Sequence, residues 1–264
     1  MRFGVCAGID KAALLAEAGC DYIELGVSTD LVPEADGETW DEKRRAIEAM
    51  PLVPEAFNFL IGKGKITGPE ADFDRLTRYM NTALARAAQV GGKTVVFGSG
   101  GARRVPDGFS FDDAEQQILR FLHLCADASD KTGVVVVIEP LNREESNIIN
   151  SVADGARLAR LVNRPGLRNL ADTYHMEREH EPLSDITASA DVLAHTHTAD
   201  IDRHAPVANK YDYVALFREL IKAGYASRPD ARISIECNWK DFASEVGPSV
   251  AVVKQAWEQA KNAT

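Results

Sequence analysis

The chain is poor in cysteine, with four residues among 264 and no Cys-x-x-Cys pair. This scarcity excludes a disulfide framework and a thiolate-rich zinc site, so we expect reduced thiols in a cytoplasmic protein. One cysteine, Cys237, directly follows a candidate functional residue, Glu236. Alternation along a strand predicts that its side chain points the other way.

Long apolar runs and an excess of positive charge are also missing. No stretch approaches the roughly 20 apolar residues of a membrane span, and the N-terminus turns polar without a signal-peptide core. The 30 Lys and Arg against 40 Asp and Glu give a formal charge of −10. That charge excludes the basic field that attracts nucleic-acid phosphates. We therefore expect a small-molecule partner, with no membrane and no nucleic acid.

No Pro/Ser-rich linker or low-complexity segment divides the chain, so we expect residues 1–264 to form one domain. Short β-branched runs instead alternate with stretches of helical periodicity, the pattern of parallel strands covered by helices. The expected strands are 3–7, 22–25, 52–57, 94–97, 134–139, 167–172, 194–198 and 233–237. The expected helices are 11–18, 39–49, 73–90, 111–131, 152–161, 213–222 and 242–261, with a weak one at 182–188.

Glycine follows several of these helices, at positions where a left-handed C-cap is favoured. Eight strand-plus-helix units of about 30 residues add up to about 250 residues, the usual size of a (β/α)8 TIM barrel. A doubly wound open sheet is the alternative. It is disfavoured because no Gly-x-Gly-x-x-Gly follows the first strand.

Four acidic or imidazole residues stand at the ends of predicted strands: Glu139, Asp172, His197 and Glu236. The carboxyl ends of barrel strands form one rim, where active sites are built. An oxygen-rich set suits Mn²⁺, Mg²⁺ or Co²⁺ better than zinc. Any one such acid alone is as well explained as a helix N-cap, and spacing leaves open whether His195 or His197 takes part. Together they predict one divalent-metal site.

Three strings in the second half carry a resemblance to a known family: Ile138-Glu-Pro-Leu-Asn-Arg-Glu-Glu145, Ala171-Asp-Thr-Tyr-His-Met176 and His195-Thr-His-Thr-Ala-Asp-Ile-Asp-Arg203. They resemble the ketose 3-epimerase branch (tagatose and psicose epimerases) of the xylose-isomerase-like barrels, also called sugar phosphate isomerases/epimerases. The resemblance implies that one divalent metal, usually manganese, is bound by Glu139, Asp172, His197 and Glu236. It selects His197 over His195.

The same resemblance assigns substrate binding to Glu145, His175 and Arg203, and catalysis to the pair Glu139 and Glu236. These two carboxylates would remove and return a proton at the carbon beside a ketose carbonyl, through an enediolate that the metal stabilises. A sugar or sugar-like substrate is therefore expected. Relatives of this kind are commonly dimers or tetramers, so the resemblance also implies a homodimer or homotetramer.

Two departures leave the substrate open. Glu236 is followed by Cys237-Asn-Trp239 where the epimerases usually have Pro-Phe, and no Gly-rich run follows Arg203. The alternatives are a lyase or dehydratase of the inosose or dehydroshikimate type, an aldose–ketose or hydroxypyruvate isomerase, and a non-catalytic sugar-binding barrel. An apurinic endonuclease is disfavoured, because six histidines and a charge of −10 suit neither its multi-zinc cluster nor a basic groove.

Two loops have alternative interpretations. Residues 98–101 with Arg103 and Arg104 are either a phosphate cradle or a tight turn with solvated arginines. Residues 59–65 are either a mobile lid or an ordinary surface loop.

Overall fold

The computed structural model describes residues 1–262 as a closed barrel. Eight parallel strands follow one another around it in chain order, and the pairing of the last with the first closes it. The strands are β1 (Arg2–Cys6), β2 (Tyr22–Gly26), β3 (Pro54–Asn58), β4 (Thr94–Phe97), β5 (Val135–Ile138), β6 (Leu167–Asp172), β7 (Leu193–Thr198) and β8 (Arg232–Ile235). The predicted single-domain (β/α)8 TIM barrel is confirmed, and the open sheet is excluded.

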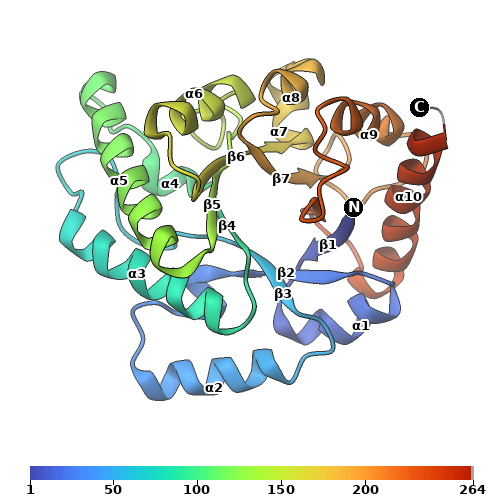
Figure 1. Ribbon diagram of the computed structural model, residues 1–264, viewed down its shortest axis with the longest axis horizontal. Coiled ribbons are helices and arrows are strands. Elements are labelled where there is room, and N and C mark those ends of the chain that lie inside the picture. The colour runs from blue at the N-terminus through green and yellow to red at the C-terminus, as the bar shows by residue number, and fades with distance from the viewer. Residues whose placement is uncertain (263–264) are drawn as a thin grey trace.

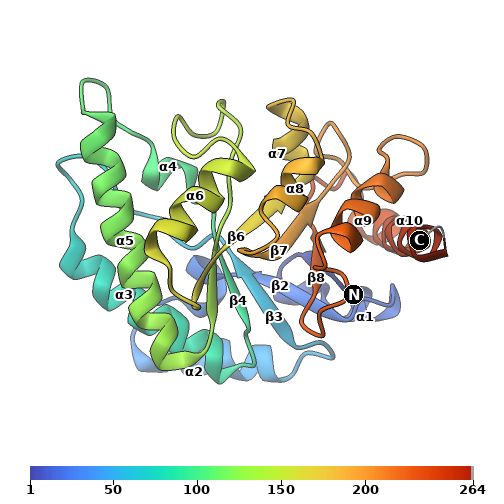
Figure 2. The ribbon, with the colours of Figure 1, turned by 45° about the horizontal axis from the view of Figure 1, so that its top comes forward.

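Helices surround the strands on the outside, as Figures 1 and 2 show. Those that match expected helices are α1 (Ala12–Glu17), α2 (Gly37–Glu48), α3 (Phe73–Gln89), α5 (Phe111–Thr132), α6 (Val152–Val162), α8 (Ser184–Ala188), α9 (Tyr213–Lys222) and α10 (Phe242–Asn262). Local chemistry sets their ends. Asp72 caps α3 by accepting from the Arg75 amide, and Gly133 ends α5 at φ 75°, a conformation that glycine adopts without strain.

Four short segments were not predicted: the 3-10 turn η1 (Ile9–Lys11), the π-helical turn η2 (Val27–Leu31), α4 (Gly100–Arg103) and α7 (Thr173–Arg178). Each is too short to show helical periodicity in the sequence. Helix α7 follows β6 without a loop, because Asp172 accepts a hydrogen bond from the Tyr174 amide at 2.8 Å and so caps the helix.

The predicted strands extend too far at two of the site residues, since β5 ends before Glu139 and β8 ends before Glu236 and Cys237. The ladder nevertheless holds both glutamates. The Glu139 amide donates to the Phe97 carbonyl and the Glu236 amide to the Thr198 carbonyl, each at 3.0 Å. Pro140 then follows Glu139 and, lacking an N–H, donates nothing to the ladder. Both carboxylates are thus held by the sheet while standing on its rim.

Arg103, in the loop after β4, belongs neither to a phosphate cradle nor to a turn with solvated arginines, the two predicted alternatives. Its side chain is fully buried and donates to the backbone carbonyls of Phe97, Glu139 and Ile149. It is therefore neither solvated nor free to bind a phosphate, and it ties three segments of the rim together. Gly98 has a packing role too, because a Cβ there would collide with the Glu139 carboxylate.

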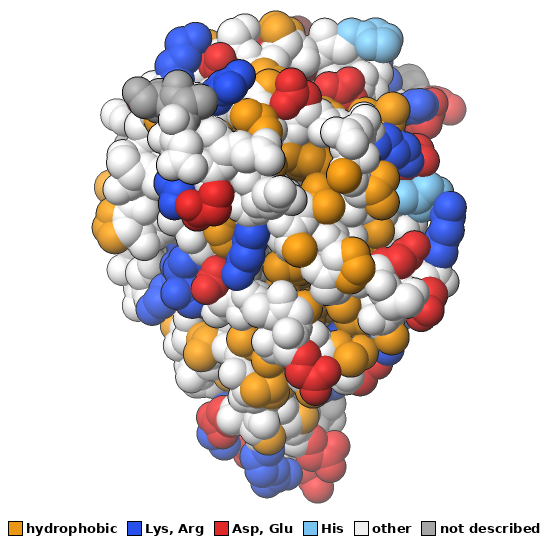
Figure 3. Space-filling model, turned by 90° about the vertical axis from the view of Figure 1, so that its right-hand side faces the viewer, with side chains coloured by type: hydrophobic (Ala, Val, Ile, Leu, Met, Phe, Trp, Pro, Cys, Tyr) orange, Lys and Arg blue, Asp and Glu red, His pale blue; other side chains and the backbone are white. Residues whose placement is uncertain are grey.

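Figure 3 views the side of the molecule that carries α9 and α10, where hydrophobic side chains gather in the middle of the face among charged ones. Below this surface the main core fills the space between the strands and the helices. Within residues 1–262, no helix has the length and apolar character that a membrane span requires.

Candidate metal and sugar site

Alternation along the strands points a set of polar side chains into the barrel. Val137 and Leu170 pack in a small apolar cluster that is separate from the main core. Glu139 and Asp172 follow them by two residues and so face the same side. Both acids are buried, so the rim carries charged groups where water is largely excluded.

The structure brings the four strand-end residues together. His197 Nδ1 lies 3.1 Å from Glu139 Oε1 and 3.4 Å from Glu236 Oε2. Asp172 completes the group, in which one potential ligand atom per residue lies within 4.8 Å of the others. These are donor atoms of four different strand ends, which is the arrangement that a mononuclear metal site requires.

Electrostatics separate the two glutamates of this group. Burial and the neighbouring Glu236 carboxylate raise the pKa of Glu139. For Glu236, burial opposes ionisation, but His197 and Arg203 outweigh it and lower the pKa to about 2. Burial together with both glutamates raises the pKa of Asp172 to about 7. Three crowded carboxylates thus make a site that gains from added positive charge.

Two buried polar atoms at the site have no hydrogen-bond partner, Asp172 Oδ2 and His175 Nε2. They lie 3.9 Å apart, beyond hydrogen-bond distance. A buried polar group without a partner is costly, and such groups are commonly completed by a ligand. The free carboxylate oxygen and the oxygen-rich donor set together fit a hard divalent cation.

The tautomer of His175 follows from its surroundings. Its Nδ1 accepts from the Asn142 amide at 3.1 Å, and the Asn142 side chain lies 2.9 Å from the same nitrogen. Burial lowers the pKa of His175 to about 3, so the ring is neutral. The proton of a neutral ring whose Nδ1 accepts is on Nε2, and this N–H is the donor that has no partner.

Arg203 links the second group of predicted residues to the first. It donates to Glu145 Oε1 at 2.6 Å and to Glu236 Oε2 at 3.3 Å, and its guanidinium lies 4.9 Å from the centre of the Tyr174 ring. Its backbone has φ 60°, a left-handed conformation that is unusual for arginine. Strain of this kind concentrates at functional sites.

Two site residues were missed in the sequence. Glu24 on β2 is fully buried and bonds both His195 and His197, and Asn58 at the end of β3 donates to Glu236 Oε1 at 3.0 Å. Nothing in the sequence around Asn58 marks it as a site residue. Glu24 could have been found, because it is the one charged residue within the predicted strand 22–25.

Two open clefts reach the four metal-site residues Glu139, Asp172, His197 and Glu236, which are called the cluster below. One, of about 410 Å³, opens towards β1 and β2, and the other, of about 510 Å³, opens towards the loops after β3 and β4. Asn58, Phe59, Arg203 and Glu236 line both. Phe59 is 67% exposed and has φ 48°. Cys237 also lines the first cleft, contrary to the prediction from alternation, because β8 has already ended at Ile235.

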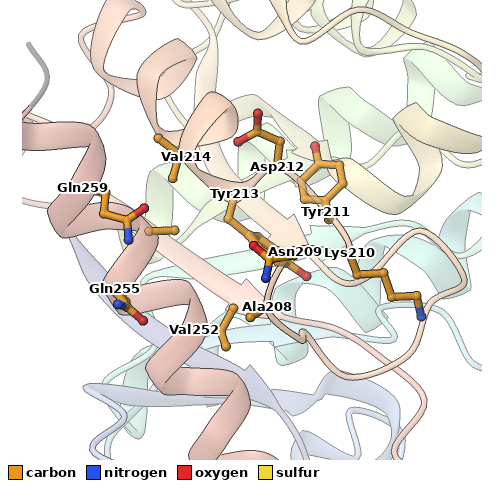
Figure 4. Close-up of a pocket in the computed structure, with 11 residues that line it drawn as sticks. Ala208, Asn209, Lys210, Tyr211, Asp212, Tyr213, Val214, Val252, Gln255 and Gln259 are labelled. Carbon is orange, nitrogen blue, oxygen red and sulfur yellow. The ribbon is translucent and has the colours of Figure 1, made fainter.

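A larger cavity of about 610 Å³ lies between the segment before α9 and helix α10 (Figure 4). Lys210 there is paired with Asp202 at 2.7 Å. Among the residues that the structure describes, no group of metal-binding side chains lines this cavity. Size alone therefore does not make it the functional site.

The loop at residues 59–65 is tied down at several points. The Tyr79 hydroxyl donates to the Leu60 carbonyl at 2.6 Å, and the Ile61 amide donates to Ser99 Oγ at 3.0 Å. Leu60 and Ile61 are both buried. These contacts favour an ordinary packed loop over a mobile lid.

Comparison with known proteins gives consistent results. The family model described as "Xylose isomerase-like TIM barrel" matches residues 12–261. A 3-dehydro-D-guloside 4-epimerase of Escherichia coli is 31% identical over 149 residues, 54% of this chain and 57% of that protein. A ketose 3-epimerase of Arthrobacter globiformis is 31% identical over 38% of this chain and 35% of its own. The matched regions thus cover at most 57% of the length of these two relatives.

Solved structures share the fold. A 3-keto-D-glucoside 4-epimerase from E. coli superposes with a TM-score of 0.81, at 24% identity, over 97% of this chain and 99% of that chain. A D-allulose 3-epimerase from Methylomonas sp., solved with D-allulose, gives 0.79 at 20% identity over 97% of both.

Proposed function

The chain belongs to the xylose isomerase-like TIM barrel family, and from that premise we propose that it is a divalent-metal-dependent sugar epimerase. It would invert the configuration of a carbon beside the carbonyl of a ketose. One observation carries this proposal, the pair Glu139 and Glu236, which both approach His197 Nδ1 and have pKa values shifted in opposite directions. Such divergence is typical of an acid and a base working together.

Glu139, Asp172, His197 and Glu236 are the residues that would hold the cation, for which we propose manganese, with magnesium or cobalt as substitutes. When bound, the cation supplies positive charge that stabilises the negative charge developing on the substrate carbonyl oxygen. The free Asp172 Oδ2 supports this assignment.

The protein's own groups move the proton. Glu236, whose pKa is lowered, removes it from the carbon beside the carbonyl, and Glu139, whose pKa is raised, delivers one to the opposite face. His175 Nε2–H and the Arg203 guanidinium donate to substrate oxygens, while Glu145 holds Arg203 in place. The reverse reaction uses the same two carboxylates with their protonation exchanged.

The experiment that tests the function uses the manganese-loaded protein with free and phosphorylated ketoses in D₂O, followed by proton NMR. Deuterium at the carbon beside the carbonyl, together with a new epimer, supports the proposal. Loss of water supports the lyase alternative, and a shifted carbonyl supports the isomerase. Absence of exchange on every sugar leaves the binding-protein alternative.

His175→Gln is expected to lower kcat/KM by about 10- to 100-fold, because a hydrogen bond to a charged oxygen contributes about 1.5–3 kcal/mol. Steady-state kinetics on the epimerised sugar measure the loss. The control is His123→Gln, since His123 is exposed on the outer helix α5 and lines neither cleft. Equal kinetics for both variants would contradict the assigned role of His175.

A second candidate, a keto-glycoside epimerase, is supported by Phe59. This exposed ring stands between two clefts that meet at the cluster, so a sugar at the acids has room for a substituent across the ring. Each cleft lies in the size range of a small-molecule pocket. The E. coli guloside epimerase acts on a sugar of this kind by its name.

Phe59→Ala is expected to lower the preference for a keto-glycoside over the free ketose about 3- to 10-fold, the usual worth of an aromatic contact. The measured quantity is the ratio of the two kcat/KM values. Phe111→Ala is the matched control, because Phe111 is 56% exposed at the start of α5 and lines neither cleft. An unchanged ratio in Phe59→Ala would remove the support for this candidate.

A further inference from the structure

Glu24 contacts two of the imidazoles that the barrel encloses, those of His195 and His197. Its Oε1 accepts from His197 Nε2 at 3.0 Å. Its Oε2 accepts from His195 Nε2 at 3.0 Å and from Ser234 Oγ at 2.6 Å. All of these side chains are fully buried. One carboxylate thus satisfies three donors that no water reaches.

The direction of these hydrogen bonds can be assigned. An ionised carboxylate only accepts, so both imidazoles carry a proton on Nε2. Ser234 donates its hydroxyl proton to Glu24. The Tyr22 hydroxyl, 2.7 Å from Ser234 Oγ, must therefore donate to the serine oxygen. The chain of donors therefore runs in one direction and ends on Glu24.

We propose that Glu24 is a positioning residue for the metal site. It fixes the His197 ring with Nε2–H on Glu24 and Nδ1 facing the acids of the metal site, 3.1 Å from Glu139 Oε1. Cation binding requires Nδ1 to give up its proton, whereas the Nε2 proton stays with Glu24. Partners of this kind behind a ligating histidine raise its basicity and fix its orientation. The inference rests on the proposed metal site but not on the identity of the sugar.

The same residues allow a rival interpretation. Cys6, Glu24 and His197 also lie close enough together to hold an ion. A second ion there would have to displace the hydrogen bonds that Glu24 accepts, and His197 Nε2 would have to lose its proton to act as a bridging ligand. The satisfied carboxylate favours positioning over a second site.

Calorimetric titration of Mn²⁺ into the metal-free protein tests the proposal without any substrate. Glu24→Gln is expected to weaken binding about 10- to 100-fold, the usual cost of losing such a partner. Glu24→Asp keeps the carboxylate and should recover part of the affinity. Ser234→Ala is the matched control, because it removes a donor to Glu24 but leaves both imidazole contacts, and it should keep the wild-type affinity.

The tautomer gives a second readout that mere structural damage does not produce. Long-range ¹H–¹⁵N NMR of the Mg²⁺-loaded protein should show His197 with its proton on Nε2. In Glu24→Gln the amide can donate to Nε2, so the proton is expected to leave that nitrogen in part or completely. An unchanged tautomer in a folded Glu24→Gln protein would overturn the proposal.

Two further results would overturn it. One is wild-type Mn²⁺ affinity in Glu24→Gln. The other is two bound Mn²⁺ per wild-type chain, with one lost in Cys6→Ala, which would assign these residues to a second metal site. If manganese binding behaves as expected but no sugar is epimerised, the proposed function fails and the role of Glu24 stands.

Discussion

Replacing Glu139 or Glu236 by glutamine is expected to lower kcat for epimerisation by about 10²- to 10⁴-fold, the usual contribution of a positioned acid or base. Glutamine keeps the shape and an oxygen donor but cannot carry a proton to carbon. The two carboxylates lie 3.1 and 3.4 Å from the same atom, His197 Nδ1. Neither can replace the other if they serve opposite faces of the reacting carbon.

Deuterium exchange separates the two roles more sharply than kcat. With one carboxylate intact, the variant still removes the proton that faces it and returns a deuteron to the same face. Each variant should therefore exchange one epimer without converting it, and Glu139→Gln and Glu236→Gln should exchange opposite epimers. Proton NMR in D₂O, started from each pure epimer, measures this.

Glu144→Gln is the matched control, because Glu144 lies in the loop after β5 but is exposed and paired with Arg178. It should epimerise like the wild type. Manganese binding by each variant must be measured alongside, since both glutamates are also proposed ligands. Exchange of both epimers by the same single variant would contradict a two-carboxylate mechanism.

The strand ends were predictable because a parallel barrel leaves little freedom. Once a β-branched run is assigned as a strand, the residue that ends it must stand on the rim, and Glu139 and Asp172 do. His195 and His197 share a face, so periodicity alone could not rank them. The structure identifies His197 as the candidate ligand, because its Nδ1 faces Glu139. The His195 side chain instead contacts the Glu24 carboxylate.

Residues that act through contacts distant in sequence were not predictable. Arg103 follows a glycine-rich turn, and its sequence context is that of a solvated or phosphate-binding arginine. Its three partners are backbone carbonyls, two of them more than 30 residues away, and sequence patterns carry no information about them. Glu24 is similar, because only the closed barrel brings β2 next to the imidazoles of β7.

Removal of the metal by a chelator is expected to abolish epimerisation, and manganese should restore it. Binding also stabilises the fold by about 2.7 kcal/mol at a hundredfold excess over Kd. For a chain of this size that is a rise of roughly 5–10 °C in Tm. Differential scanning calorimetry with and without Mn²⁺ measures it. Asp172→Asn should lose most of the rise, whereas Asp200→Asn, a change at a buried acid outside the cluster, should keep it.

The pH dependence of that rise has a definite sign. The pKa of Asp172 in the fold is about 7, above its unfolded value, so its contribution to the stability of the metal-free fold is complete at low pH and is lost as the pH rises through 7. The same ionisation frees the carboxylate for the cation, since protons and metal compete for it. The manganese-induced rise in Tm should therefore be larger at pH 8 than at pH 6. A rise that is equal at both pH values, or that survives in Asp172→Asn, would mean that the cation binds elsewhere.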